Sequence, residues 1–151
     1  MKKMLFSLMA GMMLVGCGGG GSSLPSMDNS KVSGAEETFT GYYAGNGVMF
    51  AGENIVGSWT LYQLEPEYKS TGIRFYDDGD LRYNGSTYTY GVSKDGKEVH
   101  AAYYTSLNIK YKSIEKNFVE LVGTDGKSTY QDCYNVEFQD NYGIYDLIMC
   151  P

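Results

Sequence analysis

The chain has no cluster of basic residues. Its 151 residues include twelve Lys and Arg against eighteen Asp and Glu. Proteins bind the phosphates of nucleic acids through Lys and Arg, so this acidic composition excludes nucleic acid as an expected partner. The same lack removes an electrostatic route to anionic lipid, so membrane attachment is expected to come from acyl chains alone.

Residues that carry chemistry are also scarce. His100 is the single histidine, and no activated Ser or Cys with a carboxylate partner stands beside it in the sequence. Two paired cysteines and one remote histidine provide too few ligands for zinc. The acidic run at Asp77, Asp78 and Asp80 lacks the spacing of an EF-hand loop and predicts a solvated turn. We therefore expect no enzyme, no metal site and no cofactor.

Long apolar runs are missing as well. The longest, Met4–Val15, is shorter than the roughly 20 residues that a transmembrane helix needs. No later segment has a sustained apolar stripe with the period of a helix. The run is preceded by Lys2 and Lys3 and followed by Cys17, which is the order of a secretory leader.

The end of this leader, Leu14-Val15-Gly16-Cys17, resembles the lipobox of bacterial lipoprotein signal peptides. The resemblance implies a signal peptide over residues 1–16, cleavage before Cys17 and acylation of Cys17 with palmitate or a similar chain. The protein is then held on a membrane of the bacterial cell envelope. Because Gly18 stands where an inner-membrane retention signal has Asp, the outer membrane is favoured in a two-membrane cell. The alternative is an uncut leader with a chance cysteine.

Composition divides the remainder into three parts. Residues 17–37 hold the lipidated Cys and a polar, Gly- and Ser-rich stretch that predicts a flexible tether. In residues 38–53, Asn46-Gly47 predicts a hairpin from Phe39 to Phe50, and a glycine-rich loop packed on the domain is the alternative. Residues 54–151 form the main domain.

Turn signals and the alternation of apolar and polar residues predict that this domain is all-β. Four Asn-Gly or Asp-Gly pairs, at 78–79, 84–85, 95–96 and 125–126, separate short runs of strand-forming residues. Within the runs apolar residues alternate with polar ones, as Ile73 and Phe75 do with Arg74. We expect strands near 55–64, 71–77, 80–84, 87–92, 98–104, 106–113, 117–123, 128–138 and 143–149. They predict a small antiparallel up-and-down β-barrel of about eight strands, without substantial helix after the signal peptide.

The run Gly57-Ser58-Trp59, followed by Ile73-Arg74-Phe75 and the Asp78-Gly79 turn, resembles the small bacterial lipocalin-like domains. The resemblance implies an eight-stranded cup closed at one end by Trp59, and it favours binding of a small apolar ligand. The chain departs from that pattern because no Arg follows Arg82 to cover the Trp.

Candidates for the lining of such a cup are Trp59, Phe75, Tyr88, Tyr90, Tyr111 and Phe118. An eight-stranded barrel is just wide enough for side chains to fill, so the alternative is that these residues are simply core. If the core is filled in this way, the functional site is expected on the outer surface, as in an envelope protein-interaction or inhibitor module. Tyr62, Tyr76 and Tyr104 fall opposite the core parity of their strands.

Two cysteines remain once Cys17 carries lipid. Cys133 and Cys150 lie in an oxidising compartment and predict a disulfide. The alternatives are two free thiols or pairing between chains.

Overall fold

Strands make up most of the computed structural model, which describes residues 4–5, 28–63, 69–122 and 125–151; side chains are not described at 4–5, 113–119 and 122. Eight consecutive strands pair antiparallel, each with the next: β6 (Gly57–Gln63), β7 (Lys69–Phe75), β8 (Asp80–Tyr83), β9 (Ser86–Ser93), β10 (Glu98–Ala102), β11 (Ser106–Val122), β12 (Ser128–Gln139) and β13 (Ile144–Cys150).

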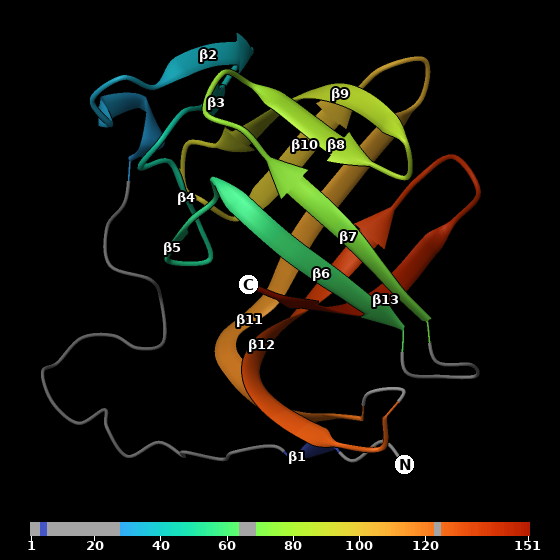
Figure 1. Ribbon diagram of the computed structural model, residues 1–151. Coiled ribbons are helices and arrows are strands. Elements are labelled where there is room, and N and C mark those ends of the chain that lie inside the picture. The colour runs from blue at the N-terminus through green and yellow to red at the C-terminus, as the bar shows by residue number, and fades with distance from the viewer. Residues whose placement is uncertain (1–3, 6–27, 64–68, 123–124) are drawn as a thin grey trace, which may run out of the picture.

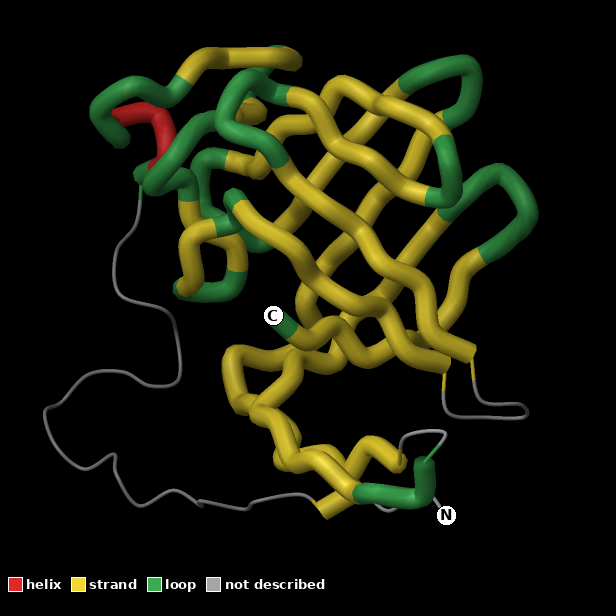
Figure 2. The backbone as a smooth tube through the Cα atoms, in the orientation of Figure 1, coloured by secondary structure: helices red, strands yellow, loops and turns green. Residues whose placement is uncertain are grey.

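The last of these strands returns to the first. In β13, Ile148 lies opposite Tyr62 of β6, and Met149 lies opposite Leu61, which closes the sheet into a ring (Figure 1). Figure 2 shows the strands at the front and back of this barrel crossing each other. The all-β, up-and-down barrel of eight strands is confirmed, and it is compatible with a lipocalin-like domain. In the described part of the chain the only helix is the single turn η2 (Asn29–Lys31).

Alternation along each strand fills the barrel. Ile73 and Phe75 are buried and Arg74 between them is exposed, as their period-two pattern predicts. Every one of the eight strands contributes at least one buried apolar side chain to the same core.

The turns follow the predicted Gly pairs. Asn84 and Gly85 both have positive φ, 51° and 82°, and join Tyr83 directly to Ser86, which is the two-residue type I′ hairpin. At 78–79, 95–96 and 125–126 only the glycine has positive φ, and longer turns result.

Two predicted strands, 106–113 and 117–123, are one strand in the structure. β11 runs through both, with a shift in its register to β12 between Tyr111 and Lys116. An irregularity of this kind bends a strand and increases its twist. The far part of the β11–β12 hairpin accordingly projects away from the barrel (Figure 2), and the short β1 (Met4–Leu5) pairs with it.

Residues 28–54 differ most from the prediction. They form β2 (Glu36–Phe39), β3 (Tyr42–Ala44), β4 (Met49–Phe50) and β5 (Glu53–Asn54), arranged as the hairpins β2–β3 and β4–β5. A hairpin centred on Asn46-Gly47 was wrong: these residues occupy a tight turn between the two hairpins, where the Val48 N–H donates to the Gly45 carbonyl over 3.1 Å.

The tether predicted over residues 17–37, of which 17–27 lie outside the described ranges, does not extend through residues 28–37, because Asn29 is fully buried. Its Nδ2 donates to the carbonyls of Met49 (3.0 Å) and Ser93 (2.9 Å), and its Oδ1 accepts from the Met49 N–H (3.0 Å). A buried amide with all these partners satisfied is stable in the interior. Composition alone hides this, since a polar residue that packs and a polar residue in a spacer look the same in the sequence.

The β2–β3 hairpin covers part of the outer barrel surface. β3 pairs with the end of β9, and the rings of Phe39 and Tyr42 lie 4.8 and 5.7 Å from that of His100 on β10. The His100 Nδ1 in turn lies 2.8 Å from the Asn108 Oδ1. His100 is therefore a strand residue held beneath a hairpin.

Candidate functional site

The two ends of the barrel differ. The end where β6 begins is covered by the preceding chain, whose Val48, Phe50 and Ile55 are completely buried (Figure 1). Trp59 lies beside this cover and donates its Nε1–H to the Ile55 carbonyl over 3.0 Å. We call this the covered end.

The opposite end is formed by the β8–β9, β10–β11 and β12–β13 connections, which Figure 1 shows together on the right of the barrel. We call it the mouth. Within the described residues, most large hydrophobic side chains that are exposed belong to it: Tyr103, Tyr104, Tyr142, Ile144 and Tyr145. Exposed apolar side chains gathered in one region mark interaction sites more often than scattered ones do.

A pocket of about 270 Å³ opens at the mouth. Its apolar wall comes from inward-facing side chains at the strand ends, and its polar groups stand around them. The lining residues are Leu61, Tyr83, Phe138 and Leu147, together with Gln63, Lys69, Thr71, Asp140 and Tyr145.

Aromatic rings continue from the pocket over the rim. Phe138 lies 5.5 Å from Tyr83, Tyr83 lies 6.5 Å from Tyr88, and Tyr103 lies 5.9 Å from Tyr88 and 4.3 Å from Tyr104, between ring centroids. All four pairs are tilted or edge-to-face, the geometry that aromatic quadrupoles favour. The mouth thus has an ordered aromatic surface.

Burial, with a smaller contribution from the nearby Asp140 charge, raises the pKa of the Tyr83 phenol. A phenol is already protonated at neutral pH, and the raised pKa extends this to more alkaline pH, so the hydroxyl can donate a hydrogen bond inside the pocket.

The predicted cup residues do not gather at one cavity. Trp59, Phe75 and Tyr90 are buried in the core, where the Phe75 and Tyr90 rings lie 5.0 Å apart. Tyr88 is the member whose ring reaches the mouth. Tyr111 packs 5.9 Å from Phe50 of the cover.

Phe118, the sixth candidate, lies on β11, and its side chain is outside the described residues. The lipidation candidate Cys17 is also outside them.

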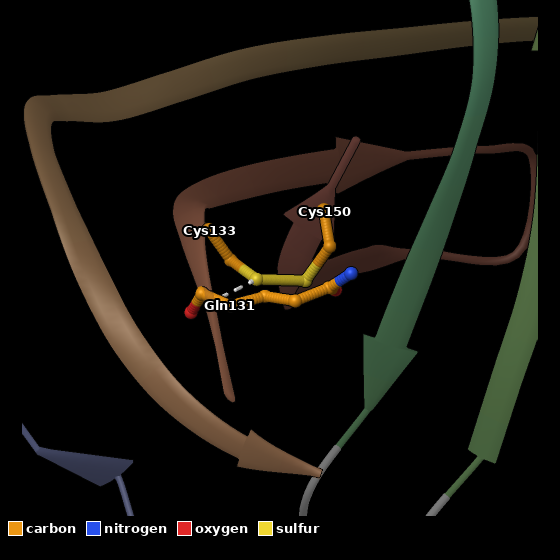
Figure 3. The surroundings of a disulfide bond; sticks show 3 residues. All are labelled: Gln131, Cys133 and Cys150. Atoms are coloured by element: carbon orange, nitrogen blue, oxygen red, sulfur yellow. Dashed lines mark hydrogen bonds between the residues drawn. A yellow bond between two sulfur atoms is a disulfide. The ribbon is translucent and has the colours of Figure 1, made fainter. Parts of the chain in front are cut away.

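Cys133 and Cys150 form the predicted disulfide (Figure 3). Their Cα atoms lie 4.5 Å apart on β12 and β13, next to the opposed pair Tyr134 and Met149. The bridge is buried in a small cluster outside the barrel core, which also contains Leu121 of the projecting hairpin. The contact of 3.8 Å from the Cys133 Sγ to the Gln131 carbonyl is packing, because a disulfide sulfur has no proton to donate.

No group of three or more His, Cys, Asp or Glu side chains with the arrangement of a metal site occurs in the described ranges. Among these same residues, no helix has the length and apolar character to cross a bilayer.

The sequence did not single out the walls of the mouth. Tyr83, Phe138 and Tyr145 share the inward parity of their strands and stand within a few residues of a turn. That combination, an inward aromatic at the end of a strand, was the available signal.

Comparison of the chain with protein-family models, with curated proteins and with solved structures finds no match.

Proposed function

We propose that the protein is a lipid-anchored lipoprotein of the bacterial envelope, in the outer membrane where the cell has two, and that it binds a small ligand at the mouth without catalysing a reaction. The leader that ends at Cys17 supports the anchor. The observation that carries ligand binding is the mouth pocket, where apolar walls meet a few polar groups.

The filled core limits what the mouth takes. Small-molecule sites usually have volumes of about 300–1,000 Å³, and the mouth pocket lies just below this range. Beneath it, Leu61 and Phe138 are part of the packed interior. The ligand is therefore an apolar ring or a short hydrocarbon segment, with a polar part that meets Gln63 and Asp140 at the rim.

Fluorescence of the neutral dye N-phenylnaphthylamine tests this proposal. We expect the protein to enhance the emission, and we expect Thr71→Leu to abolish the enhancement, because the longer side chain fills the pocket from β7. Tyr130→Ser, which removes an exposed tyrosine on the projecting hairpin, is the matched control. Equal emission with Thr71→Leu and with the unmodified protein would show that the dye binds elsewhere.

A second candidate is docking of an envelope protein on the mouth. It is favoured by Tyr104 and Tyr142, which are 88% and 84% exposed and lie beyond the pocket. Exposed Tyr is enriched at protein interfaces. Co-purification of a partner from envelope extracts should then be lost in the double variant Tyr104→Ser, Tyr142→Ser and should survive Thr71→Leu. The small-ligand proposal makes the opposite prediction for dye binding: Thr71→Leu should abolish it, and the double variant Tyr104→Ser, Tyr142→Ser should retain it.

The anchor has its own test. Radiolabelled palmitate should mark the protein and keep it in the membrane fraction, and Cys17→Ser should release it unlabelled. Label that persists in Cys17→Ser would place the lipid on another residue.

A further inference from the structure

The two arginines of the chain, Arg74 and Arg82, lie directly opposite each other on β7 and β8. The registers extend this pair into a row across four strands, with Ser58 of β6 opposite Arg74 and Thr87 of β9 opposite Arg82. All four side chains are on the outer face of the barrel. Two like charges directly opposite each other destabilise a sheet, so the row needs something that offsets this repulsion.

The described protein residues supply no anion for the pair. No carboxylate in the described ranges forms an ion pair with either guanidinium, although the chain is acidic as a whole. Instead, the guanidinium carbons of Arg74 and Arg82 lie 5.1 and 5.9 Å from the centre of the Tyr76 ring. This cation–π contact holds both forks beside the same ring.

A groove of about 670 Å³ lies beside the arginine pair. Its floor is Gly72 of β7, which has no side chain, and a Cβ added there would meet nothing within 4 Å. Polar groups surround this floor, among them the Thr60 hydroxyl and the Asn84 amide. Gly72 and the acidic β7–β8 turn lie on opposite sides of this row, so an anion on the Gly72 side of the arginines is directed away from Asp80.

Two other parts of the outer surface are covered. The β2–β3 hairpin lies over β10, and the projecting hairpin packs at the disulfide. The β6–β8 face keeps its groove. Paired guanidinium forks match the oxygens of a carboxylate or phosphate. The surrounding hydroxyl and amide groups match a ligand rich in hydroxyls, and the volume falls within the range of small-ligand sites.

We infer that this groove, which we call the arginine groove, binds a small acidic saccharide: a sugar unit that carries one carboxylate or phosphate group. The arginines hold the anion, and the polar groups around Gly72 hold the sugar hydroxyls. The groove lies on the outer face of the barrel and borders the mouth only at Tyr83 and the β8–β9 turn. Its arginine pair is absent from the mouth pocket, so the inference stands whether or not the mouth binds a ligand.

Two-dimensional NMR of the amide groups tests the inference at the groove itself. Galacturonate and glucose phosphate should shift the resonances of Gly72 and Gly85, and neutral glucose should not. Inorganic phosphate should bind at least about tenfold more weakly than glucose phosphate, because it lacks the hydroxyl contacts. Equal binding of inorganic phosphate would overturn the saccharide assignment.

Different variants test the charge of the arginine pair and the shape of the groove separately. Arg74→Gln and Arg82→Gln should each weaken binding by about tenfold or more. Gly72→Leu should abolish binding while both arginines remain, because its side chain occupies the groove. Lys127→Gln removes the same charge from the β11–β12 turn and should leave binding unchanged.

Three further results would overturn the inference: loss of binding in Lys127→Gln equal to that in the arginine variants, full binding in Gly72→Leu, or binding of phosphatidylglycerol vesicles with none of the free acidic sugars. Should an arginine variant fail to fold, Gly72→Leu still decides the outcome, since Gly72 has open space above it.

Discussion

At the scale of single residues, two glycines on the outer face of the barrel have opposite surroundings. Gly91 of β9 lies under the β2–β3 hairpin, and a Cβ there would come within 2.7 Å of the Tyr42 Cβ. Gly72 of β7 lies under nothing within 4 Å. The same residue type therefore allows close packing in one strand and leaves a hollow in another.

This difference predicts opposite effects of the same substitution. Gly91→Ala should lower the free energy of unfolding by about 1–3 kcal/mol, because the hairpin must shift to admit the methyl group. Gly72→Ala should change it by less and in the stabilising direction, by about 0.5–1 kcal/mol, since glycine weakens a strand interior. Urea denaturation of both variants checks this, and equal destabilisation would contradict the packing of the hairpin.

At the scale of elements, the strands and most turns could be predicted, because alternation and Gly pairs are local signals. The turn at Asn84-Gly85 has the expected geometry. The tight turn at Asn46-Gly47 was found, but the partners of its flanking strands were not, since Tyr43 pairs with Val92 far along the chain. Pairing at that distance leaves no local pattern.

The arginine pair could have been found from the sequence. Alternation places Arg74 and Arg82 on the same outer face of neighbouring strands, and a hairpin centred on Asp78 sets them directly opposite each other. The groove beside them could not, because it depends on which outer faces the hairpins leave open. The wall of the mouth pocket was missed for a similar reason: Tyr83 of β8 and Phe138 of β12 meet only when the barrel closes.

The disulfide joins two neighbouring elements, β12 and β13, at the base of the projecting hairpin. It spans 17 positions, which corresponds to about 3 kcal/mol in the chain-entropy model. We expect the double variant Cys133→Ala, Cys150→Ala to lose about 2–4 kcal/mol of unfolding free energy. Urea denaturation with and without reductant measures this: reductant should weaken the unmodified protein and leave the double variant unaffected. No response in either protein would contradict a bridge that stabilises the fold.

At the scale of the whole molecule, the closed barrel encloses phenols in its interior. Burial raises the pKa of Tyr90 and of Tyr134 far above the ordinary value of about 10. Tyr90 is fully buried, and its hydroxyl donates to the Tyr76 carbonyl over 2.8 Å. The folded state therefore keeps these protons at a pH where the unfolded chain releases them.

These raised pKa values make the stability of the fold depend on pH in the alkaline range. Below about pH 10 both states are protonated and stability is constant with respect to these groups. Above it the unfolded state binds fewer protons than the folded state, so stability falls by up to about 1.4 kcal/mol per pH unit for each phenol. Tyr90→Phe should cost about 1 kcal/mol at neutral pH through its lost hydrogen bond and should make the alkaline decline shallower.

Urea denaturation between pH 8 and about pH 11.5 measures the decline. Tyr142→Phe, at an exposed position of the mouth, is the control and should follow the unmodified protein. An identical decline for Tyr90→Phe and the unmodified protein would show that the Tyr90 phenol does not contribute to it.

The place where the chain enters the barrel has a consequence for access. Asp28 and Asn29 lie at the covered end, against the β9–β10 turn, and the mouth is at the opposite end. Ten residues, 18–27, separate them from Cys17, a reach of at most about 36 Å. With acyl chains on Cys17, as we propose, the tie to the bilayer enters at the covered end, so a domain standing upright on its tether has its mouth toward the aqueous compartment. Solutes diffusing through that compartment then meet the tyrosine rim first, whereas lipids still embedded in the leaflet do not.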